Sequence, residues 1–293
     1  MLTYKALIDS ATRQLYETSE TPRIDCEVLM QHMLNKDMAW LISYGDTVAS
    51  PEHNKAFFGL IAERLKGTPI AYIVGSRDFW SLELMVNEHV LIPRPDTETL
   101  VEQALELLPE NESSNVLDLG TGSGAIALSI AKERRHSNVI ALEYSKAALE
   151  VAKHNSVLNN VTNVEFRHSN WFENIGAQDR FNLIASNPPY VEPNDPHLEQ
   201  GDLRFEPISA LTAEEDGLAD IRHIIESAPL YLEHDGWLII EHGYNQANEV
   251  ESLFRANGFT EIELFFDLNK LPRCTLGKKR VQQLINSSTK STA

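Results

Sequence analysis

The sequence predicts an α/β protein in which a doubly wound parallel sheet follows a small all-helical region. From residue 97 onward, apolar runs typical of buried strands alternate with amphipathic stretches typical of helices. Before about residue 70, only helical patterns occur. Strand–helix alternation of this length predicts right-handed crossovers and a parallel sheet that helices cover on both faces.

Two proline-marked helix starts characterise the N-terminal region. Thr21 precedes Pro22, and Ser50 precedes Pro51, which is the pattern of a capping residue followed by proline in the first helical position. We therefore expect residues 1–73 to form a helical domain. On the sequence alone, this domain either stabilises the rest of the chain or recognises a macromolecular substrate.

Residues 74–92 change from helical to strand periodicity. Alternating residues 80–86 predict a strand, and Asn87 predicts a turn into a second strand at 89–92. We expect this β-hairpin to link the helical domain to the remaining segment, residues 93–293.

The strands and helices of this remaining segment can be assigned one by one. Strands are predicted at NVLDLG, NVIALE, NVEFRH, FNLIASN, WLIIEHG, EIELFFDL and CTLGKKR. Helices are predicted at ETLVEQALELL, AIALSIAKERR, KAALEVAKHNSVL, LADIRHIIESAPLYL and NQANEVESLFRANG. The polar tail from about residue 286 is expected to be disordered because it has little apolar surface to bury.

Composition and charge exclude several classes of protein. The chain has 293 residues, of which 42% are hydrophobic and 23% charged, as in a soluble globular protein. Its 25 basic and 43 acidic residues give a net charge of −18, which argues against nonspecific nucleic-acid binding. No apolar stretch reaches the roughly 20 residues of a membrane span, and no signal peptide is recognisable. We expect a cytoplasmic monomer with no metal site and two free, packed thiols, Cys26 and Cys274.

A glycine-rich loop follows the first strand of the predicted sheet and leads directly into a helix. Glycines let the backbone turn tightly and approach a ligand closely. The next strand ends at Glu143, near the offset of ~20 residues at which a carboxylate binds ribose hydroxyls in nucleotide-binding sheets. Loop and acid together favour a ligand that contains adenosine. The loop residues are Gly120, Thr121, Gly122, Ser123 and Gly124.

The spacing within this loop distinguishes between two cofactors. Nicotinamide dinucleotides are usually bound by G-x-G-x-x-G, whereas this loop reads G-x-G-x-G and follows an aspartate. That spacing resembles the S-adenosylmethionine loop of methyltransferases with a seven-stranded sheet. After the third strand, Trp171 is placed to pack against adenine and Asn170 to bind its amino edge. Alternatively, Trp171 and Phe172 form a core pair.

The motif Asn187-Pro188-Pro189-Tyr190 follows the fourth strand. In a doubly wound sheet this strand neighbours the first, so Asn187 faces the same crevice as the glycine loop. The two prolines lack N–H donors, which leaves the Asn187 side-chain oxygen and the Pro188 carbonyl as acceptors. Such acceptors suit a planar –NH₂ group, on which Tyr190 could stack. We expect these four catalytic residues to hold a flat, weakly basic nitrogen for methyl transfer.

Four stretches carry a resemblance to a known family: FWSLELMVNEHVLIPRPDTE, DLGTGSGAIAL, SNPPY and DPHLEQGDLRFEP. Up to about residue 280, the chain resembles the peptide chain release factor glutamine methyltransferases (the HemK/PrmC family). The resemblance implies a seven-stranded, Rossmann-like methyltransferase domain that uses S-adenosylmethionine. It also implies a helical N-terminal domain that helps to dock a class 1 release factor, and methylation of the glutamine side chain in the factor's Gly-Gly-Gln motif.

The resemblance further implies roles for the residues around the methyl donor. Residues Gly120 to Gly124 would line its methionine part, and Glu143 would bind its ribose hydroxyls. Asn170 and Trp171 would border adenine, although relatives often carry an acid in place of Asn170.

The substrate side of the site is implied in the same way. Asn187 to Tyr190 would hold the glutamine amide, with Asn187 also beside the cofactor. Arg94, together with residues 95–98, would form part of the rim. The alternative for this stretch is an ordinary helix start with Asp96 as its cap.

Four other functions stay open on the sequence alone. A ribosomal-protein glutamine methyltransferase has the same Asn-Pro-Pro-Tyr motif, although the PRPDTE stretch favours the release-factor enzyme. An adenine-amino methyltransferase also acts on a planar nitrogen, but the net charge of −18 argues against a nucleic-acid substrate. The loop spacing argues against a nicotinamide dehydrogenase, and the motif argues against a binding module without catalysis.

Overall fold

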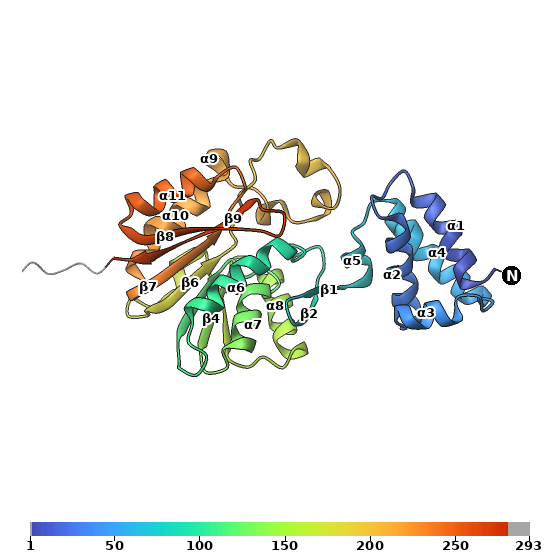
Figure 1. The fold of residues 1–293 in the computed structure, drawn as a ribbon, viewed down its shortest axis with the longest axis horizontal. Coiled ribbons are helices and arrows are strands. Elements are labelled where there is room, and N and C mark those ends of the chain that lie inside the picture. The colour runs from blue at the N-terminus through green and yellow to red at the C-terminus, as the bar shows by residue number, and fades with distance from the viewer. Residues whose placement is uncertain (1, 281–293) are drawn as a thin grey trace, which may run out of the picture.

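The computed structural model describes residues 2–280, which form a helical bundle and an α/β part that lie side by side (Figure 1). The predicted disorder of the tail from residue 286 lies outside these described residues. No helix in the described range is both long and apolar enough to cross a membrane. The predicted fold class, an α/β sheet preceded by helices, is confirmed.

Five helices form the N-terminal bundle, and those predicted to start at Pro22 and Pro51 are confirmed. Ser50 caps its helix, since its hydroxyl accepts an N–H of the first turn, whereas the Thr21 hydroxyl donates to Asp25 instead. The helices are α1 (Tyr4–Leu15), α2 (Pro22–Leu34), α3 (Met38–Tyr44), α4 (Pro51–Leu65) and α5 (Ile70–Val74). Fully buried apolar side chains build the core, among them Leu7, Leu15, Leu29, Met30 and Phe57.

The β-hairpin after the bundle is present, but its turn lies earlier than predicted. β1 (Ser76–Phe79) pairs antiparallel with β2 (Leu82–Met85), so the turn begins at Trp80. The prediction of a turn at Asn87 and a second strand at 89–92 was therefore wrong.

Two contacts explain this register. Trp80 has a left-handed backbone conformation (φ 56°), and its N–H donates to the Glu98 carboxylate at 2.8 Å. At the end of β2, the side chain of Asn155 in α8 (Lys146–Leu158) makes the hydrogen bonds that a neighbouring strand would otherwise make. It accepts from the Met85 N–H and donates to the Met85 carbonyl. An amide side chain can satisfy a strand edge in this way, and the alternation of apolar residues does not reveal it.

A seven-stranded sheet forms the centre of the α/β part, in the order β5-β4-β3-β6-β7-β9-β8. The strands from β5 to β7 run parallel, whereas β9 runs antiparallel to both β7 and β8. The expectation of an entirely parallel sheet is corrected here, because a short loop joins β8 to β9 and allows only antiparallel pairing. The strands are β3 (Asn115–Leu119), β4 (Asn138–Glu143), β5 (Val164–His168), β6 (Phe181–Ser186), β7 (Leu232–Glu241), β8 (Phe259–Phe266) and β9 (Pro272–Lys279).

Helices cover both faces of the sheet (Figure 1). Val116 and Leu183 pack with α6 and α7 on one face, while Leu117 and Ile184 pack with α10 and α11 on the other. Successive residues of a strand point to opposite faces, so a strand buried on both sides reads as a continuous apolar run. The helices are α6 (Glu98–Leu107), α7 (Ala125–Glu133), α10 (Ala219–Ser227) and α11 (Ala247–Ala256).

The strand order reverses between β3 and β6. The connections from β3 lead to β4 on one side, and β6 lies on the other side. Such a reversal leaves a crevice at the carboxyl ends of the strands. Because Leu119 pairs with Ser186, the glycine loop begins beside Asn187.

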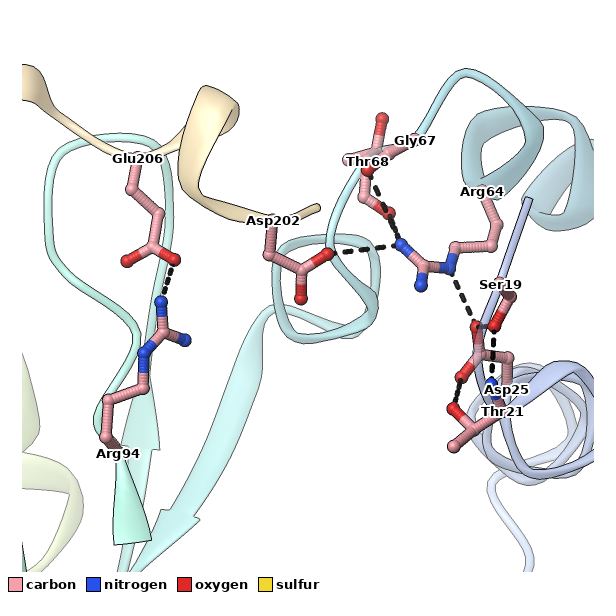
Figure 2. A network of polar contacts seen from close by, with 9 residues as sticks. All are labelled: Ser19, Thr21, Asp25, Arg64, Gly67, Thr68, Arg94, Asp202 and Glu206. Carbon is pink, nitrogen blue, oxygen red and sulfur yellow. Dashed lines mark hydrogen bonds and ion pairs between the residues drawn. The ribbon is translucent and has the colours of Figure 1, made fainter. Parts of the chain in front are cut away.

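Residues 191–212, which we call the bridging loop, reach from the motif to the helical bundle (Figure 2). A β-bridge between Val191 and Thr212 closes the base of this loop. Asp202 Oδ1 lies 3.3 Å from Arg64 Nη1 of α4. The loop contains the 3₁₀ turns η3 (Pro196–Glu199), η4 (Leu203–Phe205) and η5 (Ile208–Ala210).

Glu206 anchors the bridging loop to the α/β part. Its buried carboxylate accepts the Ile92 N–H at 3.1 Å. It also pairs with Arg94 (Figure 2). Burial raises the pKa of Glu206, and the charge of Arg94 opposes this rise. The loop is thus held by a half-buried ion pair to the bundle and by a pair next to the sheet whose carboxylate is fully buried.

We expect Glu206→Ala to destabilise the protein by about 2 kcal/mol, because it leaves the Arg94 guanidinium and the Ile92 N–H without their partner. Asp202→Ala is the control. The Asp202 side chain is 42% exposed and Arg64 keeps its pair with Asp25, so the loss should be less than about 1 kcal/mol. Urea unfolding measures both values. Equal losses would contradict the anchoring role of Glu206.

Candidate active site

A cavity of about 350 Å³ opens at the carboxyl ends of the central strands. Its volume lies in the range of small-molecule sites. Its walls come from the loops after β3, β4, β5 and β6, from residues 88–91 after the hairpin, from α10 and from the end of the bridging loop. The predicted residues that line it are Gly120, Gly122, Glu143, Asn170, Trp171, Asn187 and Pro189. The predicted residues outside this lining are Thr121, Ser123, Gly124, Pro188, Tyr190 and Arg94.

The glycine loop has the backbone that the sequence predicts. Gly120, Gly122 and Gly124 have φ values of 73°, 55° and 88°, which side chains rarely adopt. Gly124 also lies against the first turn of α7, where an added Cβ would come within 2.9 Å of Leu128 Cδ1. Gly120 is exposed to the cavity, so its backbone is open to a ligand.

Glu143 joins the loops after β3 and β4. Its Oε2 accepts the Gly122 N–H at 2.9 Å, and its Oε1 accepts the Ser145 N–H at 2.8 Å. These bonds fix the carboxylate at the edge of the cavity, and each oxygen keeps a lone pair for a further donor. A pair of ribose hydroxyls has the donors that such a carboxylate accepts.

Asp118 lies beneath the glycine loop and is fully buried. Its Oδ2 accepts from the Thr121 hydroxyl at 2.6 Å and from the Ala127 N–H at 3.2 Å. Burial raises the pKa of Asp118 to about 7, although both hydrogen bonds oppose the rise. The aspartate therefore holds the loop in shape from below.

The two aromatic residues after β5 separate in the structure. Trp171 lines the cavity, with its ring next to Gly120, whereas Phe172 is buried and stacks on Tyr231 at 4.7 Å between ring centroids. Asn170 is exposed, and its Nδ2 donates to Glu173 at 3.0 Å. The expected core pair of Trp171 and Phe172 is thus only half correct, because the indole faces the cavity.

Asp220 of α10 also lines the cavity, and no sequence pattern marks it as a site residue. Burial raises the pKa of Asp220, while a hydrogen bond with the Trp171 side chain opposes the rise. This carboxyl lies on the same side as the predicted adenine position.

The motif after β6 divides between the cavity and the interior. Asn187 and Pro189 line the cavity, while Pro188 is buried. The Tyr190 ring packs against the core around α10 and α11, and its hydroxyl donates to Glu241 Oε1 at 3.2 Å. This arrangement does not place the ring for the expected stacking on a substrate in the cavity.

The stretch before α6 differs from the sequence expectation in one respect. Asp96 was expected, as one alternative, to cap a helix, but α6 begins at Glu98 and Asp96 lies 3.4 Å from Arg273 on β9. The neighbouring Thr97 is buried and accepts from Asn187 Nδ2 at 3.3 Å. The Asp96 carboxylate is paired with Arg273 and therefore does not cap the start of α6.

Sequence reasoning missed a buried polar group behind the motif. Glu241, Asp267 and Arg273 lie there, with Asp267 Oδ2 3.0 Å from Arg273 Nη2. The one available signal was the acid at the end of the apolar run WLIIEHG, since a charge in a buried strand needs a partner.

Fold and site together define the class of this protein as a methyltransferase. Residues 97–201 match the family model of the methyltransferase small domain, and residues 6–75 match that of the PrmC N-terminal domain. A solved methyltransferase from Pyrococcus furiosus has the same fold, with a TM-score of 0.53 and 17% identity over 75% of this chain and 98% of that chain.

Curated relatives identify the family. A release factor glutamine methyltransferase from Aliivibrio fischeri is 46% identical over 278 residues, which cover 94% of this chain and 98% of the relative. One from Escherichia coli is 42% identical over 275 residues, again 94% of this chain and 98% of the relative. The chain therefore belongs to the release factor glutamine methyltransferase family, as its motifs predicted.

We expect Asp118→Asn to weaken the pH dependence of stability between about pH 4 and pH 7. The pKa of Asp118 is about 7 in the folded protein but ~3.9 when unfolded, so only the folded state holds the proton in this window. The free energy of unfolding therefore falls as the pH rises, and levels off above pH 7. The amide keeps an acceptor for Thr121 but does not titrate. Urea unfolding across this range measures the difference, and identical slopes would contradict the assignment.

Proposed function

We propose that this methyltransferase transfers a methyl group from S-adenosylmethionine to the side-chain amide of the glutamine in the Gly-Gly-Gln motif of class 1 release factors. The observation that carries the proposal is the position of Asn187, which shares one cavity with Gly120 and Glu143. An acceptor for a planar amide is thereby placed beside a site suited to adenosine. The curated relatives, named release factor glutamine methyltransferases, support the same substrate.

The donor would lie across the glycine loop. The open backbone at Gly120 and Gly122 suits the methionine part, and Glu143 suits the ribose hydroxyls. Trp171 and Asn170 would border adenine. When bound, the donor supplies a methyl group on a positively charged sulfur. Thr121, Ser123 and Gly124 would shape the loop from beneath.

The substrate amide would be held by acceptor oxygens. The Asn187 side-chain oxygen and the Pro188 carbonyl would accept its two N–H groups, and Pro189 would wall the cavity. Tyr190 would support the motif from the interior, and Arg94 would act through Glu206 at the rim. This grip fixes the nitrogen opposite the methyl group, and such positioning supplies up to ~7–11 kcal/mol in favourable systems.

The reaction needs no strong base before the bond forms. The nitrogen lone pair forms the new C–N bond as the S–C bond breaks, and the positive charge that builds on nitrogen is stabilised by the acceptor dipoles. A proton then leaves the nitrogen to water. This order of events suits the substrate side of the cavity, where the acceptors beside the nitrogen are the neutral oxygens of the Asn187 amide and the Pro188 carbonyl.

We also propose a separate role for each of the three parts of the chain. Residues 1–73 would dock the release factor, residues 74–92 would link the two parts, and residues 93–293 would carry the reaction. Exposed apolar side chains on the bundle, including Ile24 and Ile42, support docking there. We further propose a cytoplasmic monomer without stable nucleic-acid binding, in line with the net charge of −18.

Mass mapping tests the proposed reaction. The protein is incubated with isotopically labelled donor and a class 1 release factor, and we expect the label on the glutamine of the Gly-Gly-Gln motif. Asn187→Ala should lower turnover at least 100-fold because the amide loses an acceptor, with little change in donor affinity. Ribosomal proteins and nucleic acid are incubated with the enzyme and labelled donor in parallel, and label on either of them instead of the release factor would replace the proposal by one of its alternatives.

We expect Glu143→Ala to weaken donor binding about 100-fold, because two hydrogen bonds to a charged acceptor are lost. Glu143→Gln keeps one acceptor and should lie between the variant and the unaltered protein. Isothermal calorimetry with S-adenosylmethionine gives the three dissociation constants. If all three agree, the ribose assignment of Glu143 is wrong.

A further inference from the structure

Thr97 and Glu241 lie directly behind the Asn-Pro-Pro-Tyr motif. Asn187 lines the cavity, and its Nδ2 lies 3.3 Å from Thr97 Oγ1. Thr97 is 4% exposed and Glu241 1% exposed, so water cannot replace their contacts. We infer that Thr97 and Glu241 are positioning residues that turn the side-chain oxygen of Asn187 toward the substrate amide. This inference rests on the proposed function.

The direction of the hydrogen bonds decides which atom of Asn187 faces the cavity. An asparagine side chain can present its NH₂ group or its oxygen, since the two ends have similar shapes. When Thr97 Oγ1 accepts from Nδ2, the oxygen faces the cavity and can accept an N–H of the substrate. When Thr97 donates to Asn187, the NH₂ group faces the cavity and repels that donor.

Glu241 sets this direction. Its Oε1 accepts from the Tyr190 hydroxyl at 3.2 Å, and its carboxyl also interacts with the Thr97 hydroxyl. A carboxylate can only accept, so the proton of Thr97 points to Glu241 and a lone pair of Thr97 is left for Asn187. Within residues 2–280, the buried Glu241 Oε2 has no hydrogen-bond partner of its own, so it is free to accept from the Thr97 hydroxyl.

Charged neighbours balance the ionisation of Glu241. Arg273 favours the carboxylate, with its Nη1 3.5 Å from the Tyr190 hydroxyl oxygen, whereas Asp96 opposes it. Asp267 pairs with the same Arg273 guanidinium, and its Oδ2 lies 3.0 Å from Arg273 Nη2. Burial is the largest influence and raises the pKa of Glu241 to about 7.

The remaining titratable groups around Glu241 stay neutral near pH 7. Burial raises the pKa of the Cys274 thiol and of the Tyr190 hydroxyl, and it lowers the pKa of the His242 imidazole. Below about pH 7 the Glu241 carboxyl itself gains a proton and can donate to Thr97. The hydrogen bonds then run the other way, and Asn187 presents its NH₂ group.

Substitutions at Thr97 test the first link. Thr97→Val keeps the branched shape but removes the hydroxyl, and should lower kcat roughly 10–100-fold with little change in KM or in donor affinity. Thr97→Ser should recover most of the lost kcat. Thr99→Val, a matched change two residues away, should leave kcat unchanged. An unchanged kcat in Thr97→Val, or equal losses in all three variants, would overturn the inference.

Glu241→Gln tests the second link. The amide has the shape of the carboxyl but can donate to Thr97, which reverses the hydrogen bonds. We expect a loss of kcat similar to that of Thr97→Val. The decline of kcat that the unaltered enzyme shows as the pH falls through about 7 should also disappear. A variant that keeps both the kcat and the pH profile would exclude the role of Glu241.

A spectroscopic test is independent of turnover. Nuclear magnetic resonance with ¹⁵N-labelled asparagine, assigned by Asn187→Ala, reports proton exchange of the Asn187 side-chain amide. Exchange should be slow in the unaltered protein and in Thr97→Ser, and fast in Thr97→Val. Unchanged exchange in Thr97→Val would overturn the inference. If the unaltered enzyme fails to label a release factor, the proposed function fails, while this measurement still decides the orientation of Asn187.

Discussion

The whole site depends on the parallel pairing of β3 with β6. Ser186, the last residue of β6, is fully buried, and its hydroxyl donates to the Leu119 carbonyl at the end of β3 at 2.8 Å. The bond ties together two strand ends that are far apart in the sequence. The glycine loop and the Asn-Pro-Pro-Tyr motif therefore start at the same level of the sheet. A shift of one residue in β6 would turn Asn187 to the opposite face.

Buried carboxyl groups hold the parts of the site in place. Asp118 fixes the glycine loop, Glu206 fixes the bridging loop, and Glu241 lies behind the motif. Burial raises the pKa of all three, so ionising each of them as the pH rises costs the folded state part of its stability. A carboxyl group can accept from two different segments at once, which an apolar side chain cannot do. The geometry of the site is thus maintained at a cost in stability.

Local patterns predicted most of the fold because backbone requirements leave traces in the sequence. Proline in the first helical position marked α2 and α4, and apolar runs marked the strands buried on both faces. The position of the hairpin turn was predicted wrongly because the Asn155 side chain makes the hydrogen bonds of a strand at the end of β2. The alternative of a helix cap at Asp96 was wrong because Asp96 pairs with Arg273, which is distant in the sequence. Likewise, the glycine loop and the motif were recognisable, whereas Glu241 was one acid at the end of an apolar run.

The β-bridge at the base of the bridging loop makes this loop a separate appendage. Because Val191 and Thr212 are paired, the chain leaves the α/β part and returns to it at one place. Residues could be inserted into the appendage or deleted from it while β6 and α10 keep their positions. Its reach can therefore vary among homologous enzymes, and be altered by design, to suit the shape of the protein that is to be modified.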